Sequence, residues 1–414
     1  MKILLVADNC SKKMGGEAIL PYHYFRLLKK KGYDVKMIVH HRNKIELLEL
    51  FPEYKNSIFY ISDTKLQKKM WNLGIKLSKR VSETTFGFLV FLLTNYRMKK
   101  KAEEMVKDFK IDIVHQVIPV SPKVPSFMYG LGAPVIVGPM NGGMTFPKGF
   151  HRFIKLSERI SYGIGKSLSN IVNTLIPGKS KANLLLCANE RTKNSLPYIL
   201  KGKKVDIFVE NGVDLALWKN ESFEEPSSTL VEFTFVGRLV DWKGLTFLFN
   251  ALKFIKSEIE IRLNIIGSGD QKENLIKLAK KFGLESKIIF HGFTKQEAVS
   301  KILNKSRALV LPSIYECGGA VVLEAMAQSI PVIATNWGGP ADYLDECCGI
   351  LVNPNSEDLL IEGLAKAMTY LLENPEVAKA MGENGRKKVE EFYDWDKKIE
   401  TMLSYYEESI KSFG

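Results

Sequence analysis

The sequence predicts an α/β protein made of two doubly wound domains. Short apolar runs rich in β-branched residues alternate with helix-like segments in the first half, and the alternation restarts after Ser227–Ser228. Such runs are typical of parallel strands covered by helices on both faces. A length of 414 residues also favours two domains. In both sheets we expect ligands to collect at the carboxyl ends of the strands, and so in the cleft between the domains.

The expected strands can be placed in order along the chain. In the first half they are Ile3–Ala7, Val35–His40, Ile111–Val117, Pro134–Met140 and Asn183–Asn189. In the second half they are Val231–Leu239, Ile261–Gly269, Lys287–Phe293, Ala308–Ser313, Pro331–Thr335 and Gly349–Pro354. Ile207–Asp214 is interpreted as the first strand and turn of the second domain, which places the boundary near residue 200.

Composition excludes several classes of protein. With 45% hydrophobic and 25% charged residues and ordinary glycine and proline contents, the chain is neither disordered nor fibrous. Its five cysteines form no C-x-x-C or zinc-like spacing, so we expect unpaired thiols in the cytoplasm. The longest apolar stretch, Phe86–Leu93, is far shorter than the roughly 18 residues that span a bilayer. No transmembrane helix is expected.

Charge is distributed unevenly between the two halves. Residues 1–200 contain 33 Lys and Arg against 14 Asp and Glu, a net +19, whereas residues 201–414 contain 26 against 32, a net −6. A positive half attracts phosphates of anionic lipid or of nucleic acid. Aromatic residues are not interleaved with the basic ones in a recognisable binding motif, so no nucleic-acid partner is expected.

The densest basic segment is Lys65–Arg80. In it Leu66, Met70, Leu73 and Leu77 recur at helical spacing, with the lysines largely elsewhere. This pattern fits a basic helix lying on an anionic membrane surface, at the inner face of the plasma membrane. It fits equally an ordinary surface helix whose apolar stripe enters the core.

Two cations follow the first strand of the second half. In VGRLVDWKG the strand ends at Gly237, and Arg238 and Lys243 come directly after it. A strand end that opens into a helix N-terminus can hold a diphosphate, because backbone N–H groups and the helix dipole add to the positive charges. Two ordinary surface cations are the alternative.

Two acids follow a later strand. In SIYECGGAVVLEAMAQ, Glu316 precedes Gly318–Gly319, and Glu324 lies one to two turns into the helix that we expect to start near Gly319. A carboxylate accepts two hydrogen bonds at once and so matches a vicinal diol, such as ribose for one acid and a hexose for the other. The alternative is a loop acid and a helix acid without a common role.

Together these motifs are more specific than any one of them. R-x4-K after V-G, G-x-G at Gly267–Gly269, Glu-x7-Glu before E-A-M-A, and N-G-V-D at Asn211–Asp214 resemble the glycosyltransferases of family 4. The resemblance covers essentially the whole chain and is most specific from Asn211 to Leu351. Trp337–Leu344 and Pro139–Pro147 resemble a bacterial branch that works on surface polysaccharides or glycolipids.

The resemblance implies the GT-B fold, with two Rossmann-like domains facing a central cleft. Residues 1–200 would bind the acceptor and residues 201–394 the nucleotide-sugar, and a last helix, 395–414, would pack back on the first domain. It implies a retaining hexosyltransferase that uses a nucleotide-diphosphate sugar, a UDP-sugar before GDP-mannose. The acceptor would be a hydroxyl of a lipid-linked or other glycan, and no metal or other cofactor would be required. The alternative is a catalytically silent homologue that binds anionic lipid or glycan as a scaffold.

The family's roles carry over to particular residues. Arg238 and Lys243 would hold the donor diphosphate and stabilise the charge that develops as it leaves. Glu324 would bind the ribose hydroxyls and Glu316 the sugar hydroxyls, and the Gly267–Gly269 turn would line the base pocket. The remaining donor-binding positions are Gly15, Gly16, Gly237, Phe293, Gly318, Gly319 and Ala320.

The first half contributes three further candidates. Gly15–Gly16 follows the first strand and would let the backbone approach the donor or acceptor. His115 ends a strand and is a candidate catalytic residue, with a hydrogen-bonded structural histidine as the alternative. Asn141, Gly142 and Gly143 follow another strand and are candidate acceptor ligands, with a plain turn as the alternative.

The sequence also departs from the family pattern. Cys317 and Gly318 replace the common Gly and Phe after the first glutamate, so the donor-sugar pocket is expected to differ. Cys317 has no neighbouring base, and we assign it to packing. Asp394-Trp395-Asp396 has the spacing of a metal-binding D-x-D, but it directly precedes a helical pattern and is interpreted as a helix N-cap region.

Overall fold

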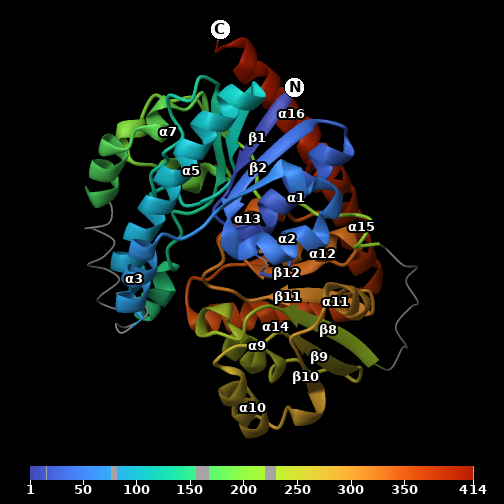
Figure 1. Ribbon diagram of the computed structural model, residues 1–414. Helices are drawn as coiled ribbons and strands as arrows, with labels where there is room; N and C mark the ends of the chain where they lie inside the picture. Colours follow the sequence, from blue (N-terminus) through green and yellow to red (C-terminus); the bar gives the residue numbers. More distant parts are fainter. Residues whose placement is uncertain (15, 76–81, 155–166, 220–229, 414) are drawn as a thin grey trace. The chain divides into compact units, whose positions relative to one another are not determined.

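In the computed structural model the chain divides into two compact units (Figure 1). Unit 1 comprises Met1–Gly143, Ile160–Glu210 and Ile399–Gly414, and unit 2 comprises Met144–Arg159 and Asn211–Lys398. The structure describes all residues except 15, 76–81, 155–166, 220–229 and 414. Part of the first half of the chain therefore belongs to unit 2, and the last residues return to unit 1.

Unit 1 contains a parallel sheet of seven strands in the order β3-β2-β1-β4-β5-β6-β7. The strands are β1 (Lys2–Val6), β2 (Asp34–His40), β3 (Ile58–Ile61), β4 (Ile113–Gln116), β5 (Val135–Met140), β6 (Leu184–Cys187) and β7 (Val205–Ile207). All residues of β4, β5 and β6 are buried. This burial explains why these strands are continuously apolar instead of alternating with polar residues.

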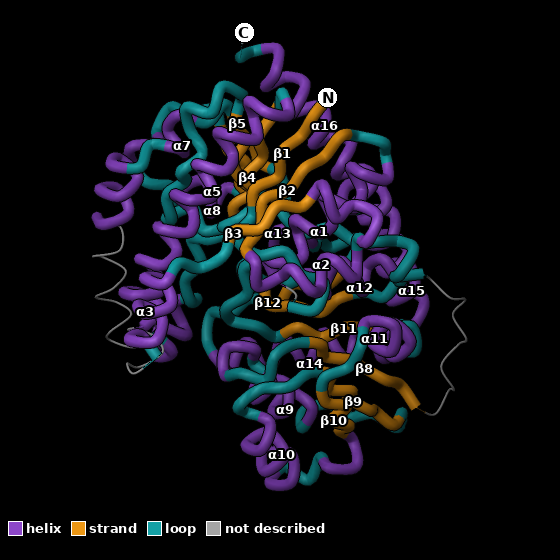
Figure 2. The backbone as a smooth tube through the Cα atoms, viewed as in Figure 1, coloured by secondary structure: helices purple, strands orange, loops and turns teal. Residues whose placement is uncertain are grey.

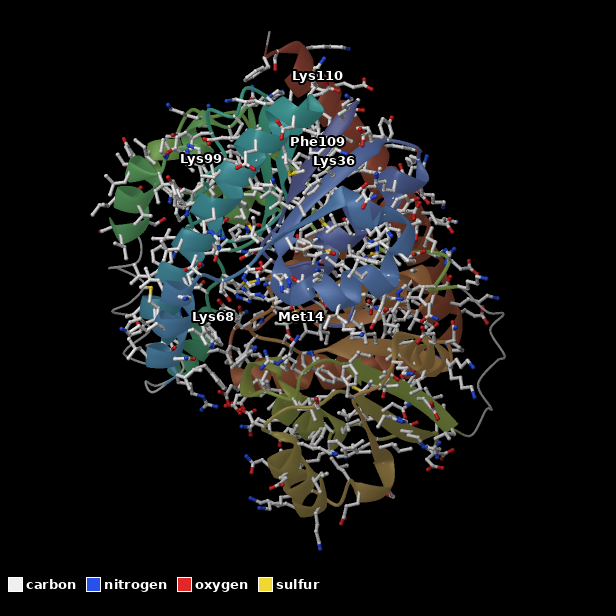
Figure 3. The ribbon with its side chains drawn as sticks, viewed as in Figure 1. Met14, Lys36, Lys68, Lys99, Phe109 and Lys110 are labelled. Atoms are coloured by element: carbon white, nitrogen blue, oxygen red, sulfur yellow. The ribbon has the colours of Figure 1, made fainter. Side chains whose placement is uncertain are left out.

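Helices follow most of these strands (Figure 2). They are α1 (Ile19–Lys30), α2 (Lys44–Leu50), α3 (Lys65–Gly74), α5 (Phe88–Phe109), α7 (Gly178–Lys181), α8 (Glu190–Asn194) and α16 (Trp395–Lys411). Met98, Ala102 and Met105 of α5 enter the core formed with the sheet. At the end of α5 the ring of Phe109 lies 4.3 Å from the ammonium of Lys36 on β2 (Figure 3).

Unit 2 contains a parallel sheet of six strands in the order β10-β9-β8-β11-β12-β13. The strands are β8 (Leu230–Val236), β9 (Glu260–Ile266), β10 (Ile288–Gly292), β11 (Ser306–Leu311), β12 (Val332–Thr335) and β13 (Gly349–Val352). The helices are α9 (Leu245–Leu252), α10 (Lys272–Lys281), α11 (Gln296–Leu303), α12 (Ala320–Ala327), α13 (Gly339–Tyr343), α14 (Glu357–Glu373) and α15 (Pro375–Lys388). The prediction of two doubly wound α/β domains is confirmed.

One predicted element is wrong. Ile207–Asp214 does not begin the second sheet, because β7 (Val205–Ile207) pairs with β6 and forms the edge of the first sheet. The main segment of unit 2 begins at Asn211, and its first strand in chain order is β8. The sequence analysis also missed β3, a four-residue edge strand whose ends alone are buried. Edge strands are short and half-buried, so their sequence pattern is weak.

Candidate functional site

Unit 2 brings the predicted cations and one predicted acid to the same point of its sheet. The order of the strands reverses between β8 and β11, which is the position where doubly wound sheets bind ligands. Arg238 and Lys243 follow β8, and Glu316 follows β11. These residues are far apart in the sequence, and the topology explains why they meet.

Lys243 and Glu316 form an ion pair between the two loops. Their side chains are 14% and 15% exposed, so the pair is largely sheltered from water. Lys243 ends a short helical turn, Asp241–Lys243, in which the carbonyl of Trp242 accepts a hydrogen bond from Ile314 N–H at 2.9 Å. The backbone therefore fixes the spacing of the loops that carry the two charges.

Three glycines lie beside this ion pair, and a Cβ would crowd its neighbours at Gly319 and Gly244. A Cβ on Gly237 would lie 3.6 Å from Lys243 Nζ, and a Cβ on Gly319 would lie 3.1 Å from Glu316 Cγ. Gly244, next to Lys243, adopts φ +75°, and a Cβ there would lie 2.0 Å from the carbonyl oxygen of Pro312. Only glycine combines this backbone conformation with so close an approach.

Arg238 lies on the same loop and differs from Lys243 in its environment. The residue is exposed, and its guanidinium forms no ion pair with any residue that the structure describes. All of its N–H donors are therefore open to an incoming group. A guanidinium presents a planar set of donors that matches phosphate oxygens two at a time.

Glu324 lies on α12, whose N-cap is Gly319 in the left-handed conformation at φ +72°. Burial raises the pKa of its carboxyl group to about 7. The residue still keeps some exposed surface, and the described part of the chain gives its carboxyl group no hydrogen bond or ion pair. A carboxyl group with open acceptor sites in a poorly hydrated place favours a partner that donates hydrogen bonds.

Close backbone contacts require glycine at both positions of the G-x-G turn. A Cβ on Gly267 would lie 1.9 Å from the carbonyl of Gly237, and a Cβ on Gly269 would lie 2.1 Å from the carbonyl of Leu239. Leu239 N–H donates to the carbonyl of Ser268 at 2.9 Å. The turn is therefore stacked on the loop that carries Arg238, which places it beside the predicted phosphate site.

The remaining donor-binding candidates differ in how deeply they are buried. Gly318 and Ala320 are half-buried next to Gly319 at the start of α12. Phe293, one residue beyond β10, is 82% exposed, and its side chain has no role in the core. Cys317 is half-buried, and neither it nor the other four cysteines forms a disulfide, as the sequence predicted.

Sequence reasoning missed a segment of the first half that packs into unit 2. This segment, residues 144–153, includes a short helical turn, Lys148–Phe153. Phe146 lies against Tyr315, with ring centroids 4.9 Å apart, and Phe150 lies 5.4 Å from Phe247 in a T-shaped contact. Three phenylalanines in eight residues, Phe146, Phe150 and Phe153, were the available sequence signal.

The same segment helps to position Glu316. Trp337 Nε1–H donates to the carbonyl of Thr145 at 2.7 Å. Two residues later, Gly339 N–H donates to the carbonyl of Glu316 at 2.8 Å. A Cβ on Gly338 would lie 2.1 Å from that carbonyl oxygen, so the loop after β12 presses on the backbone of Glu316. Residues 144–153 therefore support the acid through Trp337.

His115 is not at a site edge, and its prediction as a catalytic residue is corrected. It is 0% exposed within β4. Its Nδ1 lies 2.6 Å from the Tyr406 hydroxyl on α16, and its Nε2 lies 2.6 Å from the carbonyl of Gly138. Burial lowers the pKa of the imidazole to about 4. Both ring nitrogens are occupied inside the protein, so the structural alternative describes His115.

The Asn-Gly-Gly turn is also held by its own unit. The Asn141 side-chain amide donates to Glu210, and Gly142 N–H donates to the Thr192 hydroxyl at 3.0 Å. Gly143 has φ +72°, and a Cβ there would lie 2.7 Å from Ser195. These contacts favour the plain-turn alternative over an acceptor site. Gly16 is exposed with φ +58°, and Gly15 lies outside the described residues.

Unit 1 has its own switch point, between β1 and β4, and sequence reasoning overlooked two acids there. Burial raises the pKa of Asp8, which follows β1, although the positive charge of Arg42 opposes the shift. The pKa of Glu17 is raised by burial and by the negative charge of Asp8. Val120 N–H, beyond β4, donates to Glu17 Oε2 at 3.3 Å. The sequence signal was a carboxylate directly after a buried strand.

The D-x-D interpretation agrees with the structure. Asp394 directly precedes α16, and the backbone N–H groups of Asp396 and Lys397 donate to its carboxylate. Burial nevertheless raises the pKa of Asp394. Within the described residues no group of three or more His, Cys, Asp or Glu side chains is arranged to hold a metal ion.

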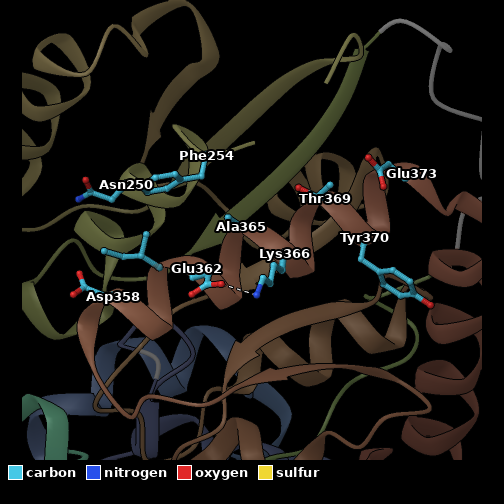
Figure 4. Close-up of a pocket in the computed structure, with 10 residues that line it drawn as sticks. Asn250, Phe254, Asp358, Glu362, Ala365, Lys366, Thr369, Tyr370 and Glu373 are labelled. Carbon is cyan, nitrogen blue, oxygen red and sulfur yellow. Dashed lines mark ion pairs between the residues drawn. The ribbon is translucent and has the colours of Figure 1, made fainter. Parts of the chain in front are cut away.

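A separate hollow of about 830 Å³ lies between α9 and α14 on unit 2 (Figure 4). Phe254 and Tyr370 provide apolar surface, and an ion pair of 2.6 Å joins Glu362 to Lys366 at its wall. None of the predicted site residues lines this hollow. It is therefore distinct from the switch-point site.

Comparison with known proteins finds similarity in the second half of the chain. Residues 219–388 match the family model described as glycosyl transferases group 1. An uncharacterized glycosyltransferase of Methanocaldococcus jannaschii is 32% identical over 181 residues, which are 44% of this chain and 45% of that protein. Glycogen synthase of Mycobacterium tuberculosis is 30% identical over 189 residues, 45% of this chain and 44% of that protein. The matches thus span about half the length of these relatives.

Solved structures confirm the fold over the whole chain. HepE of Anabaena in complex with UDP superposes with a TM-score of 0.67 at 16% identity, covering 99% of this chain and 100% of that chain. A glycosyltransferase of Rickettsia africae gives a TM-score of 0.66 at 18% identity, covering 99% and 98%. The chain therefore has the fold of these proteins, which is the GT-B fold that the sequence predicted.

Within the described ranges of the chain, no helix is both long enough and apolar enough to cross a membrane.

Proposed function

We propose that the protein is a retaining glycosyltransferase that moves a hexose from a nucleotide-diphosphate sugar to a hydroxyl group of a glycan or lipid-linked acceptor. One observation carries the proposal: Arg238 and Lys243 after β8 and Glu316 after β11 lie at the switch point of unit 2, where Lys243 pairs with Glu316. The match of residues 219–388 to glycosyl transferases group 1 supports it. So do the names of the relatives, which are glycosyltransferases and a glycogen synthase.

The chemistry that these residues can supply is electrostatic. When the bond between the sugar C1 and the phosphate oxygen breaks, negative charge develops on the leaving diphosphate and positive charge on the sugar. Arg238 and Lys243 stabilise the diphosphate, so that no metal ion is needed. The acceptor oxygen bonds to C1 on the face that the leaving group vacates, and its proton passes to the leaving phosphate.

The ion pair gives Lys243 and Glu316 linked roles. A diphosphate draws the ammonium away from Glu316, because two negative phosphates outweigh one carboxylate. Glu316 is then free to accept hydrogen bonds from sugar hydroxyls. Glu324, whose carboxyl group has open acceptor sites, binds the two ribose hydroxyls. Binding of the donor thus reorganises the pair into two separate contacts.

We infer a UDP-sugar as the first donor to test, and GDP-mannose as the second. Several solved structures with this fold contain UDP, among them HepE of Anabaena, whose complexes include UDP-glucose. We place the acceptor in unit 1, near Asp8 and Glu17 at its switch point, where two carboxyl groups can accept hydrogen bonds from sugar hydroxyls. The cytoplasm supplies nucleotide-sugars and is the proposed location.

The experiment begins with thermal shifts of the purified protein in UDP, GDP and ADP, because a ligand that binds only the folded state raises the melting temperature. Release of the nucleoside diphosphate from the matching sugar donor is then measured without added metal and in the presence of a chelator. Lys243→Ala should lose turnover, whereas Lys277→Ala, an exposed lysine of α10, should not. Nucleotide binding with no turnover by any donor would favour the catalytically silent scaffold instead.

A further inference from the structure

Unit 1 contains a helical hairpin whose outer surface is apolar. Its two arms are α3 (Lys65–Gly74) and the first turns of α5, Phe88–Leu93. Thr64 and Gln67 form a capping box at the start of α3, and the buried Gln67 amide donates to the Thr94 hydroxyl of α5 at 2.8 Å. The arms are therefore locked to each other by polar contacts, and their apolar side chains are left to face elsewhere.

The longest apolar run of the sequence lies on this hairpin and does not enter the core. Of the six side chains from Phe88 to Leu93, Leu89 is 46% exposed and the other five are half-buried. Further along the same helix, Met98, Ala102 and Met105 are fully buried against the sheet. Soluble proteins rarely expose contiguous apolar surface of this kind without a partner.

The outer face of α3 adds both apolar and basic groups. Leu66, Trp71 and Leu73 are 58%, 53% and 45% exposed, and Ile75 just beyond the helix is 64% exposed. At 100° per residue, Lys65, Lys68 and Lys69 lie between these apolar side chains, and Lys65 and Lys69 lie opposite the buried Gln67 and Gly74. Leu66 and Leu73 therefore do not form the core stripe that one interpretation of the sequence expected. Residues 76–80 of the predicted basic segment lie outside the described chain.

A second helical stretch of unit 1, residues 167–175, has its polar and apolar faces reversed. Ser169 and Asn173 are buried, and both donate side-chain hydrogen bonds to the carbonyl of Lys123. Leu168, Ile171 and Leu175 are 50%, 57% and 74% exposed. In Figure 1 this green stretch and α3 lie along the same margin of unit 1. A helix that buries polar side chains and exposes apolar ones is suited to contact with another apolar surface.

We propose that α3, the first turns of α5 and residues 167–175 form a docking face that binds the surface of an anionic lipid bilayer. Trp71 and the leucines enter the headgroup boundary, and Lys65, Lys68 and Lys69 contact lipid phosphates. Charge selects this occupant over a protein partner: the lysines lie among the apolar side chains, and the half of the chain that carries the face has a net charge of +19. Amphipathic tryptophan and lysine side chains are favoured at such boundaries.

The test is flotation of the full chain with vesicles of phosphatidylcholine mixed with phosphatidylglycerol, compared with phosphatidylcholine alone. Binding is expected only with the anionic vesicles, and it should weaken as salt shortens the Debye length from about 8 Å to about 3 Å. Lys68→Glu with Lys69→Glu should reduce the partition coefficient roughly tenfold or more. The tryptophan emission of the chain should shift to the blue on binding, and Trp71→Phe should remove that shift.

A matched pair of variants separates docking from general damage. Leu73 of α3 and Ile276 of α10 in unit 2 are both 45% exposed. Leu73→Glu should abolish flotation, whereas Ile276→Glu should leave it unchanged, and both should retain donor turnover in solution. Equal binding to neutral vesicles, or equal effects of the two variants, would overturn the proposal. So would a dimer in sedimentation that Leu73→Glu dissociates, because the face would then join two copies of the chain.

Discussion

The two units have the same kind of sheet but differ in how they hold the polar residues near the switch point. In unit 2 Arg238 and Glu324 have no charged partner in the described structure, and Lys243 pairs with the acid on the facing loop. In unit 1 His115 and Asn141 are bound to groups of their own unit. A polar side chain inside a buried strand must satisfy its hydrogen bonds internally, whereas one on a loop beyond the strand can remain open to a ligand. Position relative to the strand end therefore accounts for His115 and for the loop residues of unit 2, but not for Asn141, which follows β5 and is still bound within its own unit.

The largest expected effect is loss of turnover when the cations of unit 2 are removed. Arg238→Ala and Lys243→Ala should each reduce the rate of nucleoside diphosphate release about 10²-fold, and the double variant further, because both neutralise the leaving group. The melting temperature of Arg238→Ala should change little, since Arg238 is exposed. Lys243→Ala should lower the melting temperature, because it leaves the sheltered Glu316 carboxylate without its partner. Equal rates in the variants and the unmodified protein would contradict the proposed mechanism, and Lys277→Ala is the control.

The second prediction concerns His115 of unit 1, which the structure assigns a structural role. His115→Ala should lower the free energy of unfolding by about 3 kcal/mol, because it leaves a cavity and deprives the Tyr406 hydroxyl and the Gly138 carbonyl of a partner. Turnover per folded molecule should remain within about twofold of the unmodified protein. Removal of a group that stabilises the transition state would instead cost about 10²-fold or more. Denaturant unfolding and active-site titration measure the two quantities. A large loss of turnover at unchanged stability would restore a catalytic role.

The third effect is opposite pH dependence in the two units. Burial raises the pKa of Glu324 to about 7, so the folded state binds more protons than the unfolded state, and this contribution to stability falls as pH rises from about 4.5 to about 7. The pKa of His115 is lowered to about 4, so its contribution is lost as pH falls from about 6.5 to about 4. Because the two contributions have opposite signs over nearly the same pH range, they should largely cancel in the urea midpoints of the unmodified protein. Glu324→Gln should remove the first contribution and so reveal a midpoint that falls as pH falls from about 6.5 to about 4.

Binding of the donor should follow the ionisation of Glu324. Ribose hydroxyls donate to the carboxylate better than to the neutral acid, so donor affinity should increase as pH rises through 7. The phosphates of the nucleotide ionise in a similar range, and Glu324→Gln provides the comparison that isolates the acid. Calorimetric titration with the preferred nucleoside diphosphate should give the steeper pH dependence in the unmodified protein; equal slopes would remove Glu324 from the site.

The smallest effect concerns the support of Glu316. Trp337→Phe removes the hydrogen bond to the carbonyl of Thr145 and should lower stability by about 1 kcal/mol. Because the loop after β12 holds the backbone of Glu316, kcat should fall a few-fold while KM changes less. Steady-state kinetics and a melting curve check both. Trp242→Phe is the control, since Trp242 joins the loops through its main-chain carbonyl, which the substitution keeps.

Much of unit 2 could be predicted because its functional residues lie close to strand ends in sequence. Gly237, Arg238 and Lys243 follow one buried strand, and Glu316 follows another, so the topology alone brings them together. The segment 144–153 could not be found in this way, because its packing on Tyr315 and Phe247 depends on where the chain leaves unit 1. The acids Asp8 and Glu17 were overlooked because each is unremarkable alone and their pKa shifts arise from burial.

The sequence by itself determined the alternation of strands and helices, the excess of positive charge in the first half, and the identity of the cations and acids after β8 and β11. Local patterns suffice for these features, since periodicity and strand ends are properties of neighbouring residues. Only the tertiary structure decided that His115 is enclosed, that β7 completes the first sheet, and that the apolar run at the start of α5 stays outside the core. Burial depends on contacts between distant segments, and no local pattern records which of two apolar stretches will find a partner.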